Sequence, residues 1–262
     1  MHKKIAFNTP INSVSFGQVA VAVLKELHKK SIDPSIFPIG GSVDLSSQNL
    51  TEPFKAWLEK NTFEASAIHS RKNPAFKIWH LNGGIESVSE KQVLFSFYEL
   101  DSPTKEEINV VKNNKTLFSS KYTVEVFKQY GADCEYVPLG FDSENFKITE
   151  KQYFTDDRII FNLCGKFEKR KNHEKIIRAW MKRFGNDKKY SLQCAIYNSF
   201  LKPEQNKNIF LSILGEDPPF NVQLVKPMSQ NFLYNDFLNS GDIILGLSGG
   251  EGWALPEFQS VA

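Results

Sequence analysis

The sequence is poor in cysteine and has no long apolar run. Its 262 residues include three cysteines, Cys134, Cys164 and Cys194, and this odd, widely spaced set fits neither a disulfide framework nor a zinc spacing. We therefore expect buried thiols in a reducing compartment. Because no segment has about 18 consecutive apolar residues, we expect a cytoplasmic protein with at most peripheral membrane contact.

The sequence also lacks an excess of either charge. Its 32 Lys and Arg residues balance 30 Asp and Glu residues, which gives a net charge of +2. This balance argues against nucleic acid as a partner and leaves room only for a local basic site. The chain has no D-x-D triplet, the arrangement that holds a metal-bound diphosphate. We accordingly expect no metal and no cofactor.

What the sequence does contain is a regular alternation of short apolar runs and amphipathic stretches. This pattern is typical of strand–helix units around a parallel sheet. The alternation breaks at residues 141–157, where we place a linker. We predict an α/β fold of two doubly wound, Rossmann-like domains, residues 1–141 and 142–262, with a ligand in the cleft at the carboxyl ends of their strands. Within the first domain, "SPTKEEINVVKNN" predicts a helix with Ser102 as N-cap and Pro103 at its first position.

A basic segment, "CGKFEKRKNHEK", leaves a predicted strand through Gly165. Cations ahead of a helix suit a diphosphate, because lysine acts as a point charge and the helix N-terminus adds its dipole. Lys166 and Lys171 are the candidate ligands. For the other cations of the segment a solvated basic face is the alternative; these are Lys169, Arg170 and Lys175.

A glycine-rich loop opens the last stretch, "LSGGEGWALPEFQSVA". Its three glycines permit positive φ and close backbone approach, so the loop can point N–H groups at an anion; they are Gly249, Gly250 and Gly252. A carboxylate is unfavourable beside phosphate, so we expect Glu251 to accept hydrogen bonds from sugar hydroxyls. Gln259, one turn into the following helix, can meet a neighbouring hydroxyl. The alternative is a plain strand-to-helix turn with a surface glutamate.

In order and spacing, "VPLGFD", "GKFEKRKNHEKIIRAW" and "GGEGWALPEFQSVA" closely resemble retaining glycosyltransferases of the GT-B type. The family patterns are "VPxGVD", "GRxxxxKG" and "EGFGLPxxEA". The stretch "FSFYELDSPTKEEINVVKNNKTLFSSKYTVEVFKQYGA" is similar to part of the family's acceptor domain. The resemblance covers most of residues 91–262 and is weaker before them. It implies retaining transfer from a nucleotide diphosphate sugar, such as a UDP- or GDP-sugar, to a hydroxyl of a glycan, lipid or protein.

The resemblance also implies roles for single residues. Lys166 and Lys171 would neutralise the leaving diphosphate, and Glu251 would contact the donor sugar. Gln259 stands where the family has a glutamate that holds the ribose, and Lys166 stands where it has arginine. These two departures weaken the predicted contacts. They keep two alternatives open: an inactive partner subunit that binds sugar nucleotides, and a sugar-nucleotide epimerase of similar fold.

The first half of the chain offers weaker candidates. Gly17, in "INSVSFGQ", stands where the family has a glycine-rich loop near the donor phosphates. His80 follows a predicted strand in "IWHLNGG", where similar enzymes present a histidine to the donor sugar; a structural histidine is the alternative. Glu99 and Asp101 would face the acceptor, and for Asp101 helix capping is an equal alternative.

The last predicted helix is only about seven residues long, which is marginal for an isolated helix. In the family a further strand and helix follow this position. We therefore expect the 262 residues to be a fragment of a longer protein.

Overall fold

The computed structural model describes residues 4–151, 153–154 and 156–261, which form two compact units. Unit 1 comprises Met1–Asp142 together with Glu251–Trp253, and unit 2 comprises Ser143–Gly250 together with Ala254–Ala262. The predicted boundary between residues 141 and 142 lies one residue from this division. The sequence did not indicate that Glu251–Trp253 pack with unit 1.

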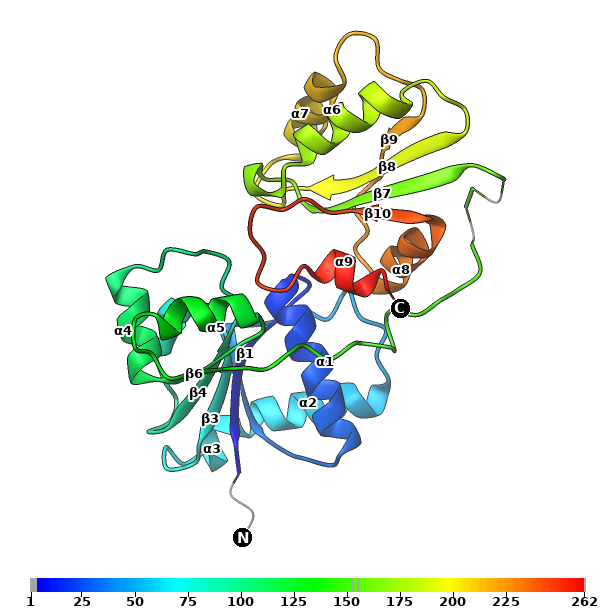
Figure 1. Ribbon diagram of the computed structural model, residues 1–262. Helices are drawn as coiled ribbons and strands as arrows, with labels where there is room; N and C mark the ends of the chain where they lie inside the picture. Colours follow the sequence, from blue (N-terminus) through cyan, green and yellow to red (C-terminus); the bar gives the residue numbers. More distant parts are fainter. Residues whose placement is uncertain (1–3, 152, 155, 262) are drawn as a thin grey trace. The chain divides into compact units, whose positions relative to one another are not determined.

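Unit 1 is a parallel sheet of six strands in the order β2-β1-β3-β4-β5-β6 (Figure 1). The strands are β1 (Ala6–Ile11), β2 (Ser35–Val43), β3 (Ala75–Ile78), β4 (Gln92–Ser96), β5 (Lys115–Phe118) and β6 (Cys134–Tyr136). The helices are α1 (Ser15–Lys29), α2 (Glu52–Phe63), α3 (Ala65–Ile68), the 3-10 helix η1 (Leu81–Ile85), α4 (Lys105–Asn113) and α5 (Lys121–Lys128). Strand order reverses between β1 and β3, and such a switch point is where doubly wound sheets bind ligands.

Helix α4 corrects one prediction. Its N-cap is Thr104, whose hydroxyl accepts from the Glu107 N–H at 3.2 Å while the Glu107 carboxylate accepts from the Thr104 N–H at 2.7 Å. This reciprocal pair satisfies two N–H groups that the helix leaves free. The predicted N-cap, Ser102, is therefore wrong, because Ser102 has no equivalent glutamate three residues later.

Unit 2 is a parallel sheet of four strands in the order β10-β7-β8-β9. The strands are β7 (Ile159–Lys166), β8 (Tyr190–Tyr197), β9 (Val222–Leu224) and β10 (Ile243–Leu245). The helices are η2 (Lys169–Lys171), α6 (His173–Phe184), α7 (Pro203–Leu214), α8 (Asn231–Ser240) and α9 (Leu255–Gln259). Here the order reverses between β7 and β10, so the switch point lies between the two strands that precede the basic segment and the glycine-rich loop.

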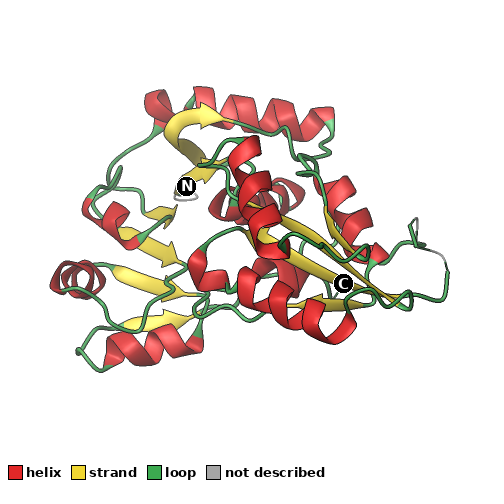
Figure 2. Ribbon diagram, turned by 90° about the horizontal axis from the view of Figure 1, so that it is seen from above, coloured by secondary structure: helices red, strands yellow, loops and turns green. Residues whose placement is uncertain are grey.

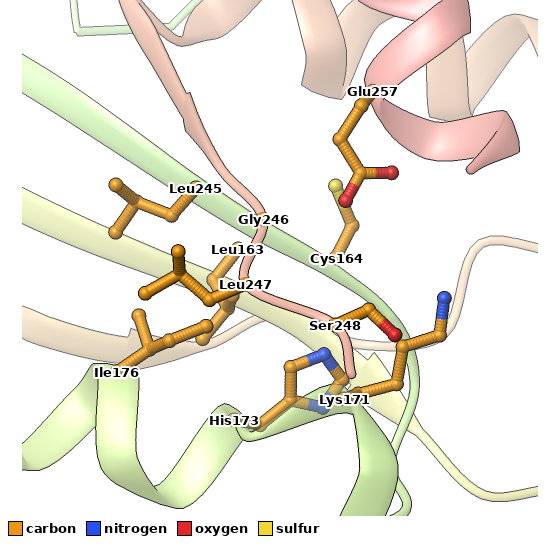
Figure 3. A pocket seen from close by; sticks show the side chains of 10 residues that line it. All are labelled: Leu163, Cys164, Lys171, His173, Ile176, Leu245, Gly246, Leu247, Ser248 and Glu257. Carbon is orange, nitrogen blue, oxygen red and sulfur yellow. The ribbon is translucent and has the colours of Figure 1, made fainter. Parts of the chain in front are cut away.

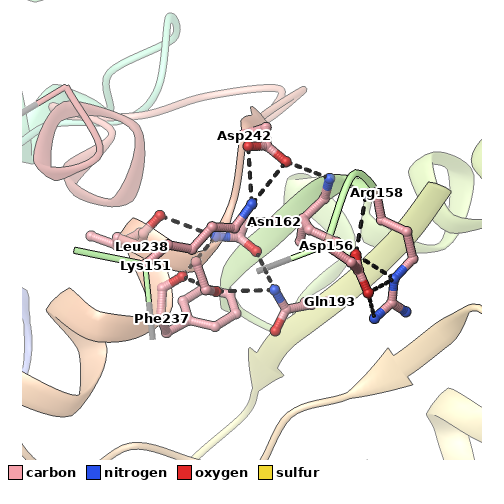
Figure 4. Close-up of polar contacts among 10 residues, drawn as sticks. Lys151, Asp156, Arg158, Asn162, Gln193, Phe237, Leu238 and Asp242 are labelled. Atoms are coloured by element: carbon pink, nitrogen blue, oxygen red, sulfur yellow. Dashed lines mark hydrogen bonds and ion pairs between the residues drawn. The ribbon is translucent and has the colours of Figure 1, made fainter. Parts of the chain in front are cut away.

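Helix α8 is fixed to the sheet of unit 2 by buried amides (Figure 4). The Asn162 side chain on β7 donates to the Phe237 carbonyl at 2.9 Å and accepts from the Gln193 amide of β8 at 3.2 Å. At the start of β10, the Asp242 carboxylate accepts from the Ile160 N–H at 2.8 Å. Because every buried polar group here has a partner, the network sets one register between α8 and the strands.

In both units strands and helices alternate along the chain. Figure 2 distinguishes the helices from the strands by colour. The prediction of two doubly wound α/β domains is confirmed for the described residues. No helix in this part of the chain is long and apolar enough to cross a membrane.

Candidate functional site

The basic segment forms a tight turn at the end of β7. Strand β7 ends at Lys166, η2 follows, and α6 begins after Asn172, whose φ of 54° is left-handed. Asparagine tolerates this conformation better than most residues. The left-handed residue turns the chain sharply into α6, so the cations of η2 stay at the carboxyl end of the sheet.

The glycine-rich loop is joined to this turn by three hydrogen bonds. The Gly249 N–H donates to the Arg170 carbonyl at 2.8 Å, and Arg170 Nη1 donates to the Gly250 carbonyl at 2.6 Å. The Asn172 side chain donates to the Leu247 carbonyl at 2.8 Å. The two segments that the sequence singled out separately therefore form one structure. Arg170 is central to it, although the sequence favoured a solvated role for this residue.

A small pocket lies where these segments meet β7 and β10 (Figure 3). Its volume is about 10 Å³, close to that of one water molecule. Apolar side chains gather on one side of the pocket and the polar and charged ones lie on the other, among them His173 at the start of α6. The lining residues are Leu163, Cys164, Lys171, His173, Ile176, Leu245, Gly246, Leu247, Ser248 and Glu257.

Lys171 supplies the cation of this pocket. It is only 9% exposed, and its side chain reaches Gly165, whose φ of 115° is open to glycine alone. A buried ammonium is costly unless an anion or hydrogen-bond acceptors compensate it. The structure thus places one of the two predicted phosphate ligands in a pocket at the switch point of unit 2.

Lys166, the second predicted phosphate ligand, does not line this pocket. Its ammonium lies 3.1 Å from Glu168 and 4.7 Å from the centre of the Phe200 ring, and its side chain is 41% exposed. Glu168 also pairs with Arg170 at 2.8 Å. Lys166 therefore belongs to a charged group beside the pocket, and its contact with a diphosphate stays a prediction.

Glu257 is a charged pocket residue that sequence reasoning missed. Its side chain projects from α9 toward Cys164 and packs directly onto Gly246, where a Cβ would overlap the carboxylate (Figure 3). Burial raises the pKa of the neighbouring Cys164 thiol to about 12, so this thiol is unreactive at neutral pH. Glu257 occupies a position that varies in the family pattern, so the resemblance did not point to it. The one available signal in the sequence was a carboxyl group in the first turn of a predicted helix.

Close packing requires a glycine at position 252, whereas a Cβ at Gly249 would make only ordinary contact with the Arg170 carbonyl. A Cβ at Gly252 would lie 2.6 Å from Cβ of Phe97, and the Ser119 hydroxyl donates to the Gly252 carbonyl at 2.7 Å. None of the three glycines has positive φ; the left-handed residue of the turn is Ala254, with φ 57°. The predicted contacts of Gly249, Gly250 and Glu251 with a donor, and that of Gln259, stay predictions.

In unit 1, the predicted residue His80 packs against an aromatic cluster formed by Phe16, Trp79 and Phe97. The Phe16 ring lies 4.4 Å from that of Phe97 and 4.6 Å from the imidazole of His80, measured between centroids. Burial lowers the pKa of His80, so its imidazole is neutral at pH 7. Gly17 lies in the first turn of α1, against Asn12, and a Cβ there would overlap this residue. The cluster thus lies at the switch point between β1 and β3.

The two acceptor candidates, Glu99 and Asp101, are exposed and follow β4. Asp101 does not cap α4, since Thr104 does, and the alternative of helix capping is therefore wrong. Facing the acceptor stays a prediction for both. Within the described residues there is no group of three or more His, Cys, Asp or Glu side chains arranged to hold a metal ion.

Comparison with solved structures identifies the fold class of this chain. No family model matches the sequence, and no curated protein matches it either. The structure is similar to that of TarM, with 11% identity, a TM-score of 0.54, 76% of this chain covered and 41% of TarM. This chain thus spans less than half of TarM. At these identities the likeness establishes the fold, which is the GT-B fold of two doubly wound domains.

Two further structures match over more of their length. Anabaena HepE, solved in complex with UDP and glucose, is 12% identical with a TM-score of 0.60, over 94% of this chain and 74% of HepE. The α,α-trehalose 6-phosphate synthase of Burkholderia multivorans is 10% identical with a TM-score of 0.67, over 100% of this chain and 79% of the synthase. Both matches extend across units 1 and 2. The predicted GT-B fold is therefore confirmed.

Proposed function

We propose that this protein transfers a sugar from a nucleotide diphosphate sugar, such as a UDP- or GDP-sugar, to an acceptor hydroxyl with retention of configuration. The observation that carries the proposal is Lys171, a buried ammonium fixed at the switch point of a doubly wound sheet beside two glycines. A cation at this position suits a diphosphate. HepE, a structure of the same fold, binds UDP and glucose.

In the proposed reaction the protein forms no covalent bond to the sugar. Lys171, with Lys166 beside it, neutralises the charge that develops on the departing diphosphate, and the acceptor hydroxyl attacks on the same face of the sugar. Glu251 orients the sugar through its hydroxyls, and His80 contacts the sugar as a further ligand. Binding both substrates in fixed positions supplies much of the rate.

We propose that the reaction needs no metal, because lysine ammonium groups take the place of a metal ion on the diphosphate. We also propose a cytoplasmic location, which the three free and buried cysteines support. Turnover should be the same with a chelator and with added Mg²⁺ or Mn²⁺. A strict requirement for either ion would contradict the proposed metal independence but not the proposed sugar transfer.

The test of the function is turnover of a panel of UDP- and GDP-sugars with and without candidate acceptors. Lys171→Ala should lower kcat about 100-fold, as for other groups that stabilise a departing or developing negative charge. Lys175→Ala, which removes an exposed cation from α6, should leave kcat unchanged. Donor binding without turnover would identify an inactive partner subunit. Release of free sugar without any acceptor would identify an epimerase.

A further inference from the structure

Lys77 is a buried lysine of unit 1 that the proposed reaction does not use. It lies on β3 and is only 3% exposed. Its ammonium donates to the carbonyl of Gly83 at 2.8 Å and to the carbonyl of Glu86 at 2.5 Å. Gly83 belongs to η1, and Glu86 is the residue that ends it. Lys77 therefore ties η1 back to the strand that precedes it.

The buried ammonium favours a closed η1. Burial lowers the pKa of Lys77, and the charge of Glu86 offsets only part of this effect. The two carbonyl oxygens compensate the loss of water around the ammonium only while both stay within hydrogen-bond distance. An η1 that moved away would leave the cation with neither acceptor. Lys77 therefore stabilises this segment in one position.

Close packing holds the same segment. A Cβ at Gly83 would overlap Cδ1 of Trp79, and a Cβ at Gly84 would lie 2.6 Å from Cγ1 of Val110. The Gln92 amide of β4 donates to the Gly84 carbonyl at 3.3 Å. The two glycines of "HLNGG" thus let η1 rest directly on its neighbours, where side-chain donors reach its carbonyls.

His80 stands at the start of this segment. It is the N-cap of η1 and stays accessible to solvent. The centre of its ring lies 5.0 Å from that of Trp79 and 4.6 Å from that of Phe16. The Gly83 N–H donates to the His80 carbonyl at 3.0 Å. Since the Gly83 carbonyl accepts from Lys77, two hydrogen bonds connect the ammonium to the backbone of His80.

We propose that Lys77 is a positioning residue for His80. By binding the Gly83 and Glu86 carbonyls, Lys77 keeps η1 closed and so fixes the imidazole at the switch point between β1 and β3. An effect of Lys77 on turnover rests on the proposed function, because it requires His80 to contact the donor sugar. The position of His80 can be measured without turnover.

NMR titration of the histidines tests this position, with His80→Gln to assign the signal of His80. Burial lowers the pKa of His80 from its ordinary value of 6.5. Lys77→Met fills a similar space without donors, so η1 should open and the pKa of His80 should rise toward 6.5. Lys25→Met removes a second buried ammonium of unit 1, which lies 3.1 Å from Asp142, and should leave the pKa of His80 unchanged.

An unchanged pKa of His80 in Lys77→Met would overturn the proposal. A loss of stability alone does not move this pKa, because the titration follows the folded protein. Lys77→Gln keeps one amide donor and should give a smaller rise. It replaces Lys77→Met if that variant does not fold.

A double-mutant cycle measures the effect on turnover. His80→Ala and Lys77→Met should each lower kcat about tenfold, the loss expected for one hydrogen bond to the sugar. The double variant should be no slower than His80→Ala, and Lys25→Met should match the wild type. Additive losses would overturn the role of Lys77 as a residue that acts through His80. Absence of turnover in the wild-type chain would instead overturn the proposed function, and the titration would still decide whether Lys77 positions His80.

Discussion

The guanidinium of Arg170 and the carbonyl of Gly250 form a 2.6 Å hydrogen bond between residues 80 positions apart. The same arginine pairs with Glu168, and its carbonyl accepts from the Gly249 N–H. One residue therefore closes the glycine-rich loop onto the basic turn.

Replacing Arg170 should loosen this loop. Arg170→Ala should weaken binding of the nucleoside diphosphate about tenfold or more, because a hydrogen bond to a charged group is worth about 1.5–3 kcal/mol. Arg170→Lys should recover only part of the loss, since lysine cannot bond Gly250 and Glu168 with one planar group. Titration calorimetry measures both variants, with the exposed Lys169→Ala as the control. Equal affinities for Arg170→Ala and wild type would show that the loop does not contribute to binding.

Glu251 is predicted to contact the sugar and not the nucleotide. Glu251→Ala should abolish most transfer while leaving the affinity for free nucleoside diphosphate intact, or slightly improved by removal of a negative charge. Turnover assays with titration of donor and free nucleotide separate these effects. The exposed Glu59→Ala of unit 1 serves as control. An equal loss for both ligands contradicts the assignment.

Ala254 is the N-cap of α9 in a left-handed conformation, with φ 57° and ψ 58°. This conformation costs a residue with a Cβ about 1–2 kcal/mol and costs glycine little. Ala254→Gly should therefore stabilise the protein by about 1 kcal/mol and raise the melting temperature by about 2–4 °C. Ala179→Gly, on the exposed face of α6, should lower stability by a similar amount. A decrease in melting temperature for Ala254→Gly would rule out the left-handed cap.

His80 should make stability depend on pH. Burial lowers its pKa below the ordinary value of 6.5, so between these two pKa values the unfolded chain binds more protons than the folded chain. Stability should therefore fall as pH drops through 6.5 and level off below the folded pKa. His80→Gln should lose this part of the dependence of the free energy of unfolding on pH. The effect is small because the imidazole is partly exposed. Urea unfolding at pH 5.5 and 7.5 measures it, and identical slopes for both proteins would show that His80 is not the source.

The sequence by itself determined the fold class and indicated where along the chain the candidate site lies. Alternating apolar and amphipathic runs depend only on local periodicity, and they predicted both doubly wound units. The basic segment and the glycine-rich loop were visible because lysine charge and glycine flexibility are properties of single residues. Lys171 was singled out from the sequence, and the structure places it in a pocket at the switch point; its contact with a diphosphate stays a prediction.

Tertiary structure decided which neighbours these residues have. The link from Arg170 to Gly250 and the pocket that holds Lys171 and Glu257 join segments about 80 residues apart, and no local pattern records such contacts. The wrong N-cap prediction has the same cause. Thr104, and not Ser102, caps α4 because Thr104 forms reciprocal hydrogen bonds with Glu107. Which side chain of α9 lines the pocket depends on how that helix packs, with Glu257 against Gly246 just after β10. Packing, and not composition, therefore selects Glu257 over Gln259.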